Sequence, residues 1–235
     1  MKWNTPLFKK LHWSGEISRL EQKQKVAEHI ASRLRDGDIV GIGSGSTAFV
    51  ALQALAERSK KEGLKFTAIP TSAEITLACA VLNVPTTTLL DARPDWALDG
   101  ADEVDKDRNL LKGRGGAMFK EKLNIISSPE NYILIDKSKR VDRLGKRFPI
   151  PVEIYPESLP LVESALLDMG ASEVVLRLAE KKDGPVITES GNFILDVRFP
   201  EIKATLERDL KQITGVIESG LFIGYDIKVV VEGEF

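Results

Sequence analysis

The chain has 235 residues, enough for one large domain or two modest ones. Its 33 basic and 35 acidic side chains nearly balance, so it lacks the basic excess of a nucleic-acid-binding protein. One cysteine and two histidines, His12 and His29, argue against a disulfide and against a metal site built from these residues. No apolar run approaches the roughly 20 residues of a membrane-spanning helix, and the N-terminus lacks a secretory apolar core. We therefore expect a cytoplasmic protein with no membrane partner.

Residues 1–15 form an aromatic arm that holds Trp3, Trp13, Phe8 and Leu11. Disordered tails are usually poor in aromatic residues. We therefore expect this arm to pack against its own domain or against a neighbouring subunit.

The first half of the chain alternates helices and strands. Apolar residues at helical spacing predict a first helix over residues 16–34, ended by Asp36-Gly37. Further helices are expected at 48–58 and 73–82, and strands at 38–40, 64–69, 84–90, 96–98 and 132–135. This order predicts an α/β fold with a Rossmann-like, mostly parallel sheet, whose ligands bind beyond the carboxyl ends of the strands.

The turn Gly41-Ile42-Gly43-Ser44-Gly45-Ser46-Thr47 lies between a strand and a helix, where backbone amides and the positive helix end favour an anion. Its glycines let the backbone approach a phosphate, and its hydroxyls are donors. It lacks the lysine of a nucleotide P-loop, and its glycine spacing differs from the dinucleotide fingerprint. A small phosphorylated ligand is therefore favoured over a plain tight turn. We interpret Thr71-Ser72 as a helix cap, with donation to a ligand as the alternative.

The stretch 98–122 carries the strongest chemical signal. It places acidic residues, among them Asp99, Asp102, Glu103 and Asp105, before a basic, glycine-rich turn, Lys112-Gly113-Arg114-Gly115-Gly116. A helix carrying Glu121 follows. Carboxylates, a lysine and exposed amides suit proton transfer on an anionic sugar, whereas the structural alternative is a solvated acidic loop after an Asp-Gly turn.

Past Gly145 the pattern changes. Phe148-Pro149-Ile150-Pro151 predicts a connector. Strands are then expected at 152–155, 173–178, on both sides of Gly191-Asn192, at 216–218 and at 221–223, with helices at 159–169 and 202–213. This is the split βαβ order of a small α+β domain. We expect residues 147–215 to form that domain, and residues 1–146 and 216–235 to form the catalytic domain, with 226–232 returning as a strand to the first sheet.

Several segments, taken in order, resemble ribose-5-phosphate isomerase of the A type. They are Val40 to Thr47, Asp99-Gly100-Ala101-Asp102-Glu103, Lys112 to Ala117, Glu121-Lys122, Asp136-Lys137-Ser138-Lys139 through Leu144-Gly145, Gly191 to Asp196, and Gly215-Val216 with Gly220-Leu221-Phe222. The resemblance extends from about Leu20 to the C-terminus. It implies an isomerase that interconverts ribose 5-phosphate and ribulose 5-phosphate without a metal or other cofactor. A homodimer or homotetramer is expected, with a phosphorylated pentose as the small-molecule partner.

The resemblance also implies roles for single residues. Glu121 resembles the general base, and Asp99, Asp102 and Lys112 resemble the polar groups around the ring oxygen and first two carbons of the sugar. The expected substrate-binding residues are Ser44, Gly45, Ser46, Thr47, Gly100, Ala101, Gly113, Arg114, Gly115 and Lys139. Two residues depart from the family pattern. Ser44 stands where threonine is expected, and Arg114 interrupts a run of glycines, where its side chain would either narrow the pocket or contact the phosphate.

Two other functions fit parts of the pattern. A sugar-phosphate sensor would use a similar site, but the residues before Glu16 leave no room for an added DNA-binding module. An acyl-CoA transferase would use Glu121 as a nucleophile and form a covalent thioester, which acetyl-CoA would reveal.

Overall fold

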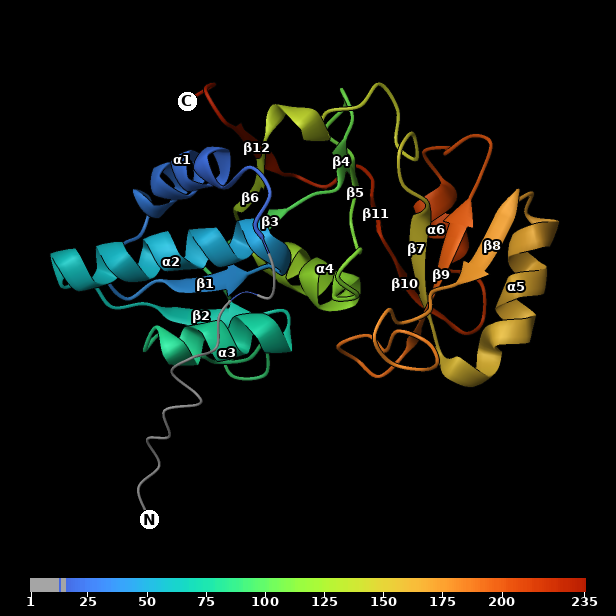
Figure 1. The fold of residues 1–235 in the computed structure, drawn as a ribbon, viewed down its shortest axis with the longest axis horizontal. Coiled ribbons are helices and arrows are strands. Elements are labelled where there is room, and N and C mark those ends of the chain that lie inside the picture. The colour runs from blue at the N-terminus through green and yellow to red at the C-terminus, as the bar shows by residue number, and fades with distance from the viewer. Residues whose placement is uncertain (1–12, 14–15) are drawn as a thin grey trace, which may run out of the picture. The chain divides into compact units, whose positions relative to one another are not determined.

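The computed structural model describes Trp13 and residues 16–235 (Figure 1). Its contacts divide the chain into two compact units. Unit 1 consists of residues 1–100, 124–137 and 227–235, and unit 2 of residues 101–123 and 138–226. The domain boundaries expected from the sequence stay a prediction. Most of the aromatic arm lies outside the described residues, but the ring of Trp13 lies 5.1 Å from that of Phe49.

Unit 1 is built on a five-stranded sheet in the order β12-β6-β3-β1-β2. Every pairing in it is parallel, as the alternation of strands and helices predicts. The elements are α1 (Leu20–Ala31), β1 (Ile39–Ile42), α2 (Gly45–Glu62), β2 (Thr67–Pro70), α3 (Ala73–Val81), β3 (Trp96–Gly100), β6 (Asn131–Ile135) and β12 (Lys228–Val231). The expected return of the C-terminal strand to this sheet is confirmed by β12.

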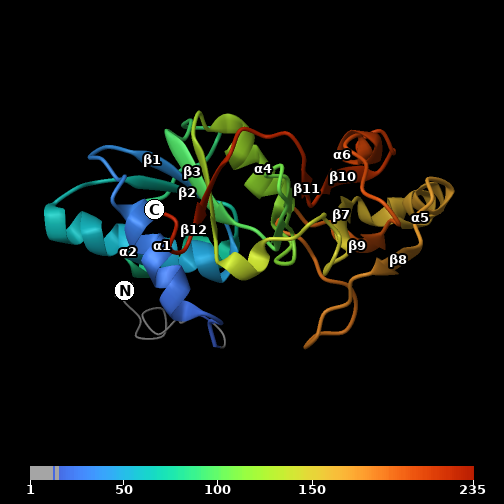
Figure 2. The same ribbon diagram turned by 90° about the horizontal axis from the view of Figure 1, so that it is seen from above.

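The apolar core of unit 1 is formed by its helices and its sheet. Helices α1 and α2 lie side by side in both views (Figures 1 and 2) and pack their apolar faces on the sheet through buried residues such as Ile30 and Leu52. Strands β6, β3 and β1 are neighbours and parallel, so their carboxyl ends lie at one edge. The segments that follow them are three of the loops expected to carry function. Of the described helices, none combines the length and apolar character needed to span a membrane.

Unit 2 contains two antiparallel sheets. The three-stranded sheet has the order β11-β5-β4 and the four-stranded sheet the order β10-β7-β9-β8. The strands are β4 (Glu103–Val104), β5 (Leu110–Leu111), β7 (Ile150–Ile154), β8 (Glu173–Leu176), β9 (Phe193–Arg198), β10 (Val216–Ser219) and β11 (Leu221–Phe222); the helices are α5 (Leu159–Asp168) and α6 (Leu206–Leu210), with 3-10 turns η2 (Lys137–Lys139) and η3 (Pro156–Ser158). The order β7-α5-β8-β9-α6-β10 is the expected split βαβ pattern. The predicted fold class is confirmed.

Helix α4 (Met118–Ser127) carries Glu121, as expected. Its residues up to Leu123 belong to unit 2, and those from Asn124 belong to unit 1. Asn124 is buried and donates to the Ile69 carbonyl at 2.9 Å.

Two predicted strands are absent, and one predicted helix is shorter than expected. Residues 84–90 form no strand and contribute only an isolated bridge between Thr86 and Ala68, because Pro85 lacks the amide that a ladder needs. The strand expected before Gly191 is also missing, since the Thr188 hydroxyl accepts the amide of Asn192 and closes a turn there. The helix expected over 202–213 is α-helical only in α6. Apolar residues of this stretch do pack into the core at helical spacing, but those outside α6 do so from the flanking segments.

Candidate active site

The glycine-rich turn of unit 1 places an acid against its backbone. A Cβ atom on Gly43 would lie 2.0 Å from Cγ of Asp99, so only glycine leaves room for this carboxylate. The Gly43 amide donates to the Leu98 carbonyl at 2.8 Å, which fixes the turn to β3. Gly45 has a φ angle of +80°, a conformation that favours glycine. The two glycines therefore serve different geometric needs.

Two hydroxyls of this turn, those of Ser44 and Ser46, are already engaged with polar neighbours. The Ser44 and Thr71 hydroxyl oxygens lie 2.7 Å apart, and the Lys23 ammonium donates to the Ser46 hydroxyl at 2.8 Å. The Gly45 amide at the start of α2 donates to the Glu74 carboxylate at 2.8 Å. A carboxylate thus occupies the positive end of this helix, as expected of an anion-binding terminus.

Lys23 is a residue that the motif analysis missed. It is buried, with 7% of its surface exposed, and it brings a cation to the Ser44–Thr47 turn. A signal was available, because Lys23 lies three, four and seven residues before Val26, Ala27 and Ile30, on the apolar face of the predicted helix. A lysine on that face needs a polar partner inside the protein.

Asp99 and Gly100 lie next to the same turn. Asp99 is buried, and its Oδ1 accepts the Gly100 amide at 2.7 Å. A Cβ atom on Gly100 would meet the Thr47 side chain at 3.4 Å. The structure therefore gathers the Ser44–Thr47 turn, Lys23, Asp99 and Gly100 at the carboxyl ends of β1 and β3. Ser72 caps α3 by accepting the Ile75 amide at 3.3 Å, which confirms the interpretation of that residue as a cap.

Unit 2 holds a buried ion pair between two of the predicted catalytic residues. Lys112 Nζ lies 3.2 Å from Glu121 Oε2, and their side chains are 4% and 6% exposed. Glu121 lies in the first turn of α4, whereas Lys112 follows β5. Glu121 Oε2 contacts the Lys112 ammonium as an ion pair. The pair places a buried carboxylate beside a cation, an arrangement that suits a general base.

The turn between Lys112 and α4 is held from both sides. Gly113 has a φ angle of +102°, and the Arg114 amide donates to Asp102 Oδ2 at 3.4 Å. The Arg177 guanidinium, paired with Asp196, donates to the carbonyls of Gly113 and Arg114 at 3.0 and 3.1 Å. Arg177 was not predicted, because nothing near it in the sequence connects it with this turn.

The side chain of Arg114 contacts an aromatic ring, and the two roles considered for it stay predictions. Its guanidinium lies over the ring of Phe148, 4.7 Å from the centroid, in a cation–π contact. Its φ angle is not positive, so its backbone fits the turn without the strain that a left-handed conformation would bring. A non-glycine residue is therefore tolerated at this point of the glycine-rich run.

The carboxylate of Glu103 is occupied by backbone amides. It is fully buried and accepts the amides of Gly145, Arg147 and Phe148 at 2.7, 2.6 and 3.1 Å. Carboxylate hydrogen bonds to amides are strong, so Glu103 ties β4 to the 145–148 segment.

The remaining predicted residues are placed less distinctively. Ala101 follows β3, Gly115 lies exposed at the tip of the glycine-rich turn, and Lys139 is partly exposed in η2. Among the residues described, no group of three or more His, Cys, Asp or Glu side chains is placed to hold a metal ion. A cavity of about 750 Å³ in unit 1 is lined by α2, α3 and their following loops, away from these residues in the sequence.

Fold and side chains together define an α/β protein with a glycine-rich turn of the anion-binding kind at a helix start and a buried acid–lysine pair. These are features of an enzyme that acts on a small anionic molecule. The family model described as ribose 5-phosphate isomerase A (phosphoriboisomerase A) matches residues 67–234. The chain belongs to this family.

Individual relatives are similar to this chain in sequence or structure over nearly its whole length. Ribose-5-phosphate isomerase A of Thermosynechococcus vestitus is 41% identical over 218 residues, which cover 91% of this chain and 92% of the relative. The solved ribose 5-phosphate isomerase A of Methanocaldococcus jannaschii is 40% identical, with a TM-score of 0.88 over 92% of this chain and 96% of that one. A further solved D-ribose-5-phosphate isomerase, in complex with phospho-erythronic acid, is 34% identical with a TM-score of 0.87 over 93% and 96%.

Proposed function

We propose that this protein interconverts D-ribose 5-phosphate and D-ribulose 5-phosphate by proton transfer through an enediolate, without a metal or organic cofactor. The observation that carries the proposal is the buried Glu121–Lys112 ion pair in a chain of an isomerase family. A relative in complex with phospho-erythronic acid supports an anionic sugar derivative as ligand. This places the reaction in the non-oxidative pentose phosphate pathway.

The turn in unit 1 is proposed to bind the phosphate. The start of α2 offers backbone amides and a positive helix end. The Lys23 ammonium, which donates to the Ser46 hydroxyl, brings a full positive charge to the turn. Ser44, Ser46 and Thr47 add hydroxyl donors. A phosphate that takes the Gly45 amide would displace the Glu74 carboxylate, an exchange of one anion for another.

Glu121 is proposed to move the proton. Asp99 or Asp102 first assists ring opening by proton transfer to the ring oxygen. The Glu121 carboxylate then removes the proton on carbon 2, the bond electrons form the C1–C2 double bond, and the carbonyl oxygen at carbon 1 becomes negative. The hydroxyl proton on the carbon-2 oxygen passes to the negative oxygen at carbon 1, the same carboxyl group returns its proton to carbon 1, and the oxygen at carbon 2 becomes the ketone.

Lys112 is proposed to stabilise the negative oxygens of this intermediate. A positioned general base contributes about a hundred- to ten-thousand-fold, which is too little alone for so weak a carbon acid. Preset charges and dipoles in a water-poor site supply the larger share. Lys112 is 4% exposed, and the neighbouring turn adds backbone amides.

The test is an assay of ketose formation from ribose 5-phosphate, run in ²H₂O and after exhaustive chelation with EDTA. We expect activity to persist after chelation and deuterium to appear at carbon 1 of the ketose. Absence of turnover would overturn the function, and loss that only a metal restores would overturn the metal-free scheme. An unlabelled product would leave two explanations, a hydride shift or a base shielded from solvent, and near-normal turnover of the Glu121→Gln variant would then favour the hydride shift.

The assembly state and cellular location are proposed as well. A homodimer or homotetramer is supported by exposed apolar side chains in unit 2, among them Leu161, Leu167 and Leu178. The cytoplasmic location is supported by membership of a family of metabolic enzymes. Sedimentation equilibrium of the full chain tests the assembly, and a monomer at micromolar concentration would contradict it.

A further inference from the structure

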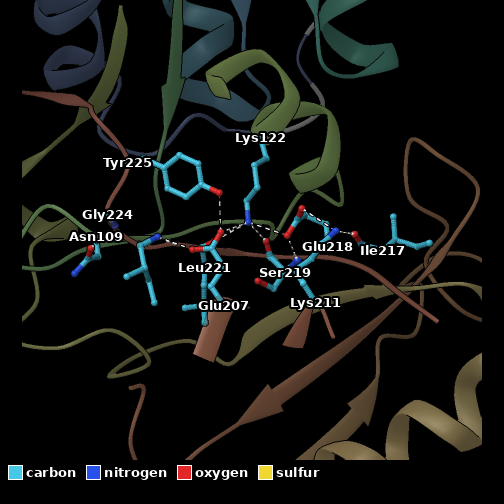
Figure 3. A network of polar contacts seen from close by, with 11 residues as sticks. Asn109, Lys122, Glu207, Lys211, Ile217, Glu218, Ser219, Leu221, Gly224 and Tyr225 are labelled. Atoms are coloured by element: carbon cyan, nitrogen blue, oxygen red, sulfur yellow. Dashed lines mark hydrogen bonds and ion pairs between the residues drawn. The ribbon is translucent and has the colours of Figure 1, made fainter. Parts of the chain in front are cut away.

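Lys122, the residue after the proposed base, is the centre of a buried polar network (Figure 3). Its ammonium lies 2.6 Å from Glu207 Oε1 and 2.8 Å from Glu218 Oε1. It also contacts the backbone carbonyls of Leu221 at 2.8 Å and Ser219 at 3.2 Å. An ammonium has three protons, so these acceptors use its whole donor capacity.

The segment that accepts from Lys122 also holds Lys112. The Lys112 amide donates to the Gly220 carbonyl at 2.8 Å, and Leu111 pairs with Leu221 across β5 and β11. A Cβ atom on Gly220 would lie 2.1 Å from the Lys112 carbonyl oxygen, so the two backbones are in close contact. Residues 219–221 therefore anchor α4 through the Lys122 side chain and Lys112 through its backbone.

The outer part of the network keeps the two carboxylates in place. Glu207 accepts the Tyr225 hydroxyl at 2.9 Å and the Ile223 amide at 2.7 Å, and Lys211 pairs with Glu218 Oε2 at 3.3 Å from the more exposed side. Burying several charges is expensive, and such networks are weak evidence of added stability. Their arrangement does specify geometry, because each member is tied to a particular partner.

We propose that Lys122 is a positioning residue, which holds the Glu121 carboxylate at its working distance from Lys112 by fixing α4 to residues 219–221. Consecutive helical residues point about 100° apart, so Lys122 anchors the helix on one side while Glu121 faces Lys112. This inference rests on the proposed isomerase function. A misplacement of about 1 Å in a catalytic group costs roughly a hundredfold in rate.

The first experiment replaces Lys122 by methionine, which keeps the length of the side chain and removes its donors. We expect kcat for ribose 5-phosphate to fall about a hundredfold, while KM changes less than threefold. Folded protein is measured by circular dichroism at the assay temperature. The matched control is Lys182→Met, the same change at an exposed position outside the network, which should leave kcat within twofold.

A purely structural role predicts that activity falls only as far as the folded fraction falls. Because Lys122→Met leaves unpaired buried carboxylates, the triple variant Lys122→Met, Glu207→Gln, Glu218→Gln removes those charges at nearly constant volume. Slow turnover in this folded, neutral variant supports positioning, and wild-type turnover in it overturns the proposal. Wild-type enzyme that shows no isomerisation refutes the function itself, whereas active wild-type enzyme with unchanged variants refutes only the role of Lys122.

Discussion

Replacing Glu121 by glutamine removes a proton acceptor and a charge while keeping the shape of the side chain. As a general base, Glu121 is worth about a hundred- to ten-thousand-fold in kcat, or roughly 3 to 5 kcal/mol of barrier at 1.36 kcal/mol per factor of ten. The substitution also ends the 3.2 Å contact of opposite charges with Lys112. At an effective dielectric constant near 20, that contact corresponds to about 5 kcal/mol of attraction, partly offset by the cost of burying both groups.

The loss of the general base and the loss of the buried ion pair are detected by different measurements. We expect Glu121→Gln to lower kcat at least about a hundredfold with KM nearly unchanged, and to lower the free energy of unfolding by up to about 3–5 kcal/mol because Lys112 loses its buried partner. Turnover is measured by ketose formation and stability by urea unfolding. Glu163→Gln, the same change at an exposed position of α5, is the matched control and should alter neither quantity. A variant that is less stable but turns over normally would remove Glu121 from the role of base.

Three further variants test two other residues of the site and one buried acid outside it. Lys112→Ala should reduce kcat by more than tenfold through lost charge stabilisation; an effect on KM alone would make Lys112 a phosphate anchor. Lys23→Met should raise KM several-fold and leave kcat nearly constant, and a loss confined to kcat would contradict its assignment to phosphate binding. Burial raises the pKa of Glu153 above 4.5, against the smaller opposing effect of its contacts with Asn192 and Thr188. The native state therefore keeps a proton that the unfolded chain releases, so this group's contribution to stability falls as the pH rises from 4.5 through the raised pKa. Relative to the wild type, Glu153→Gln should gain stability from pH 4 to pH 8 in calorimetric scans, and an equal difference at both values would refute this explanation.

The spacing of apolar residues, together with glycine and proline at the ends of elements, predicted most elements of the fold. The helical spacing of apolar residues located α1, and the helix expected over 159–169 corresponds to α5. The helix expected over residues 202–213 is too long because periodicity reports which side chains face the core and not the backbone conformation that places them there, whereas the two missing strands reflect Pro85 and the turn at Thr188. Residues 202–213 pack against the core of unit 2 at helical spacing, although only Leu206–Leu210 is α-helical.

Local motifs indicated the candidate residues but not the side chains that support them. Glu103 belongs to the same acidic stretch as Asp99, yet it binds backbone amides more than forty residues further along the chain. Arg177 and Lys23 reach their turns from distant parts of the sequence. Such pairings depend on tertiary contacts, which no local pattern contains.

The glycines show most clearly what the sequence leaves open. In the sequence, Gly43 was interpreted as room for a phosphate, but in the structure the space beside its backbone holds the Asp99 carboxylate, 2.0 Å from where a Cβ atom would lie. Gly220 similarly makes room for the backbone of Lys112. An alanine at either position would displace a proposed catalytic residue before it could affect a ligand. The glycine motifs of this chain therefore place an acid and a lysine as directly as they admit an anion.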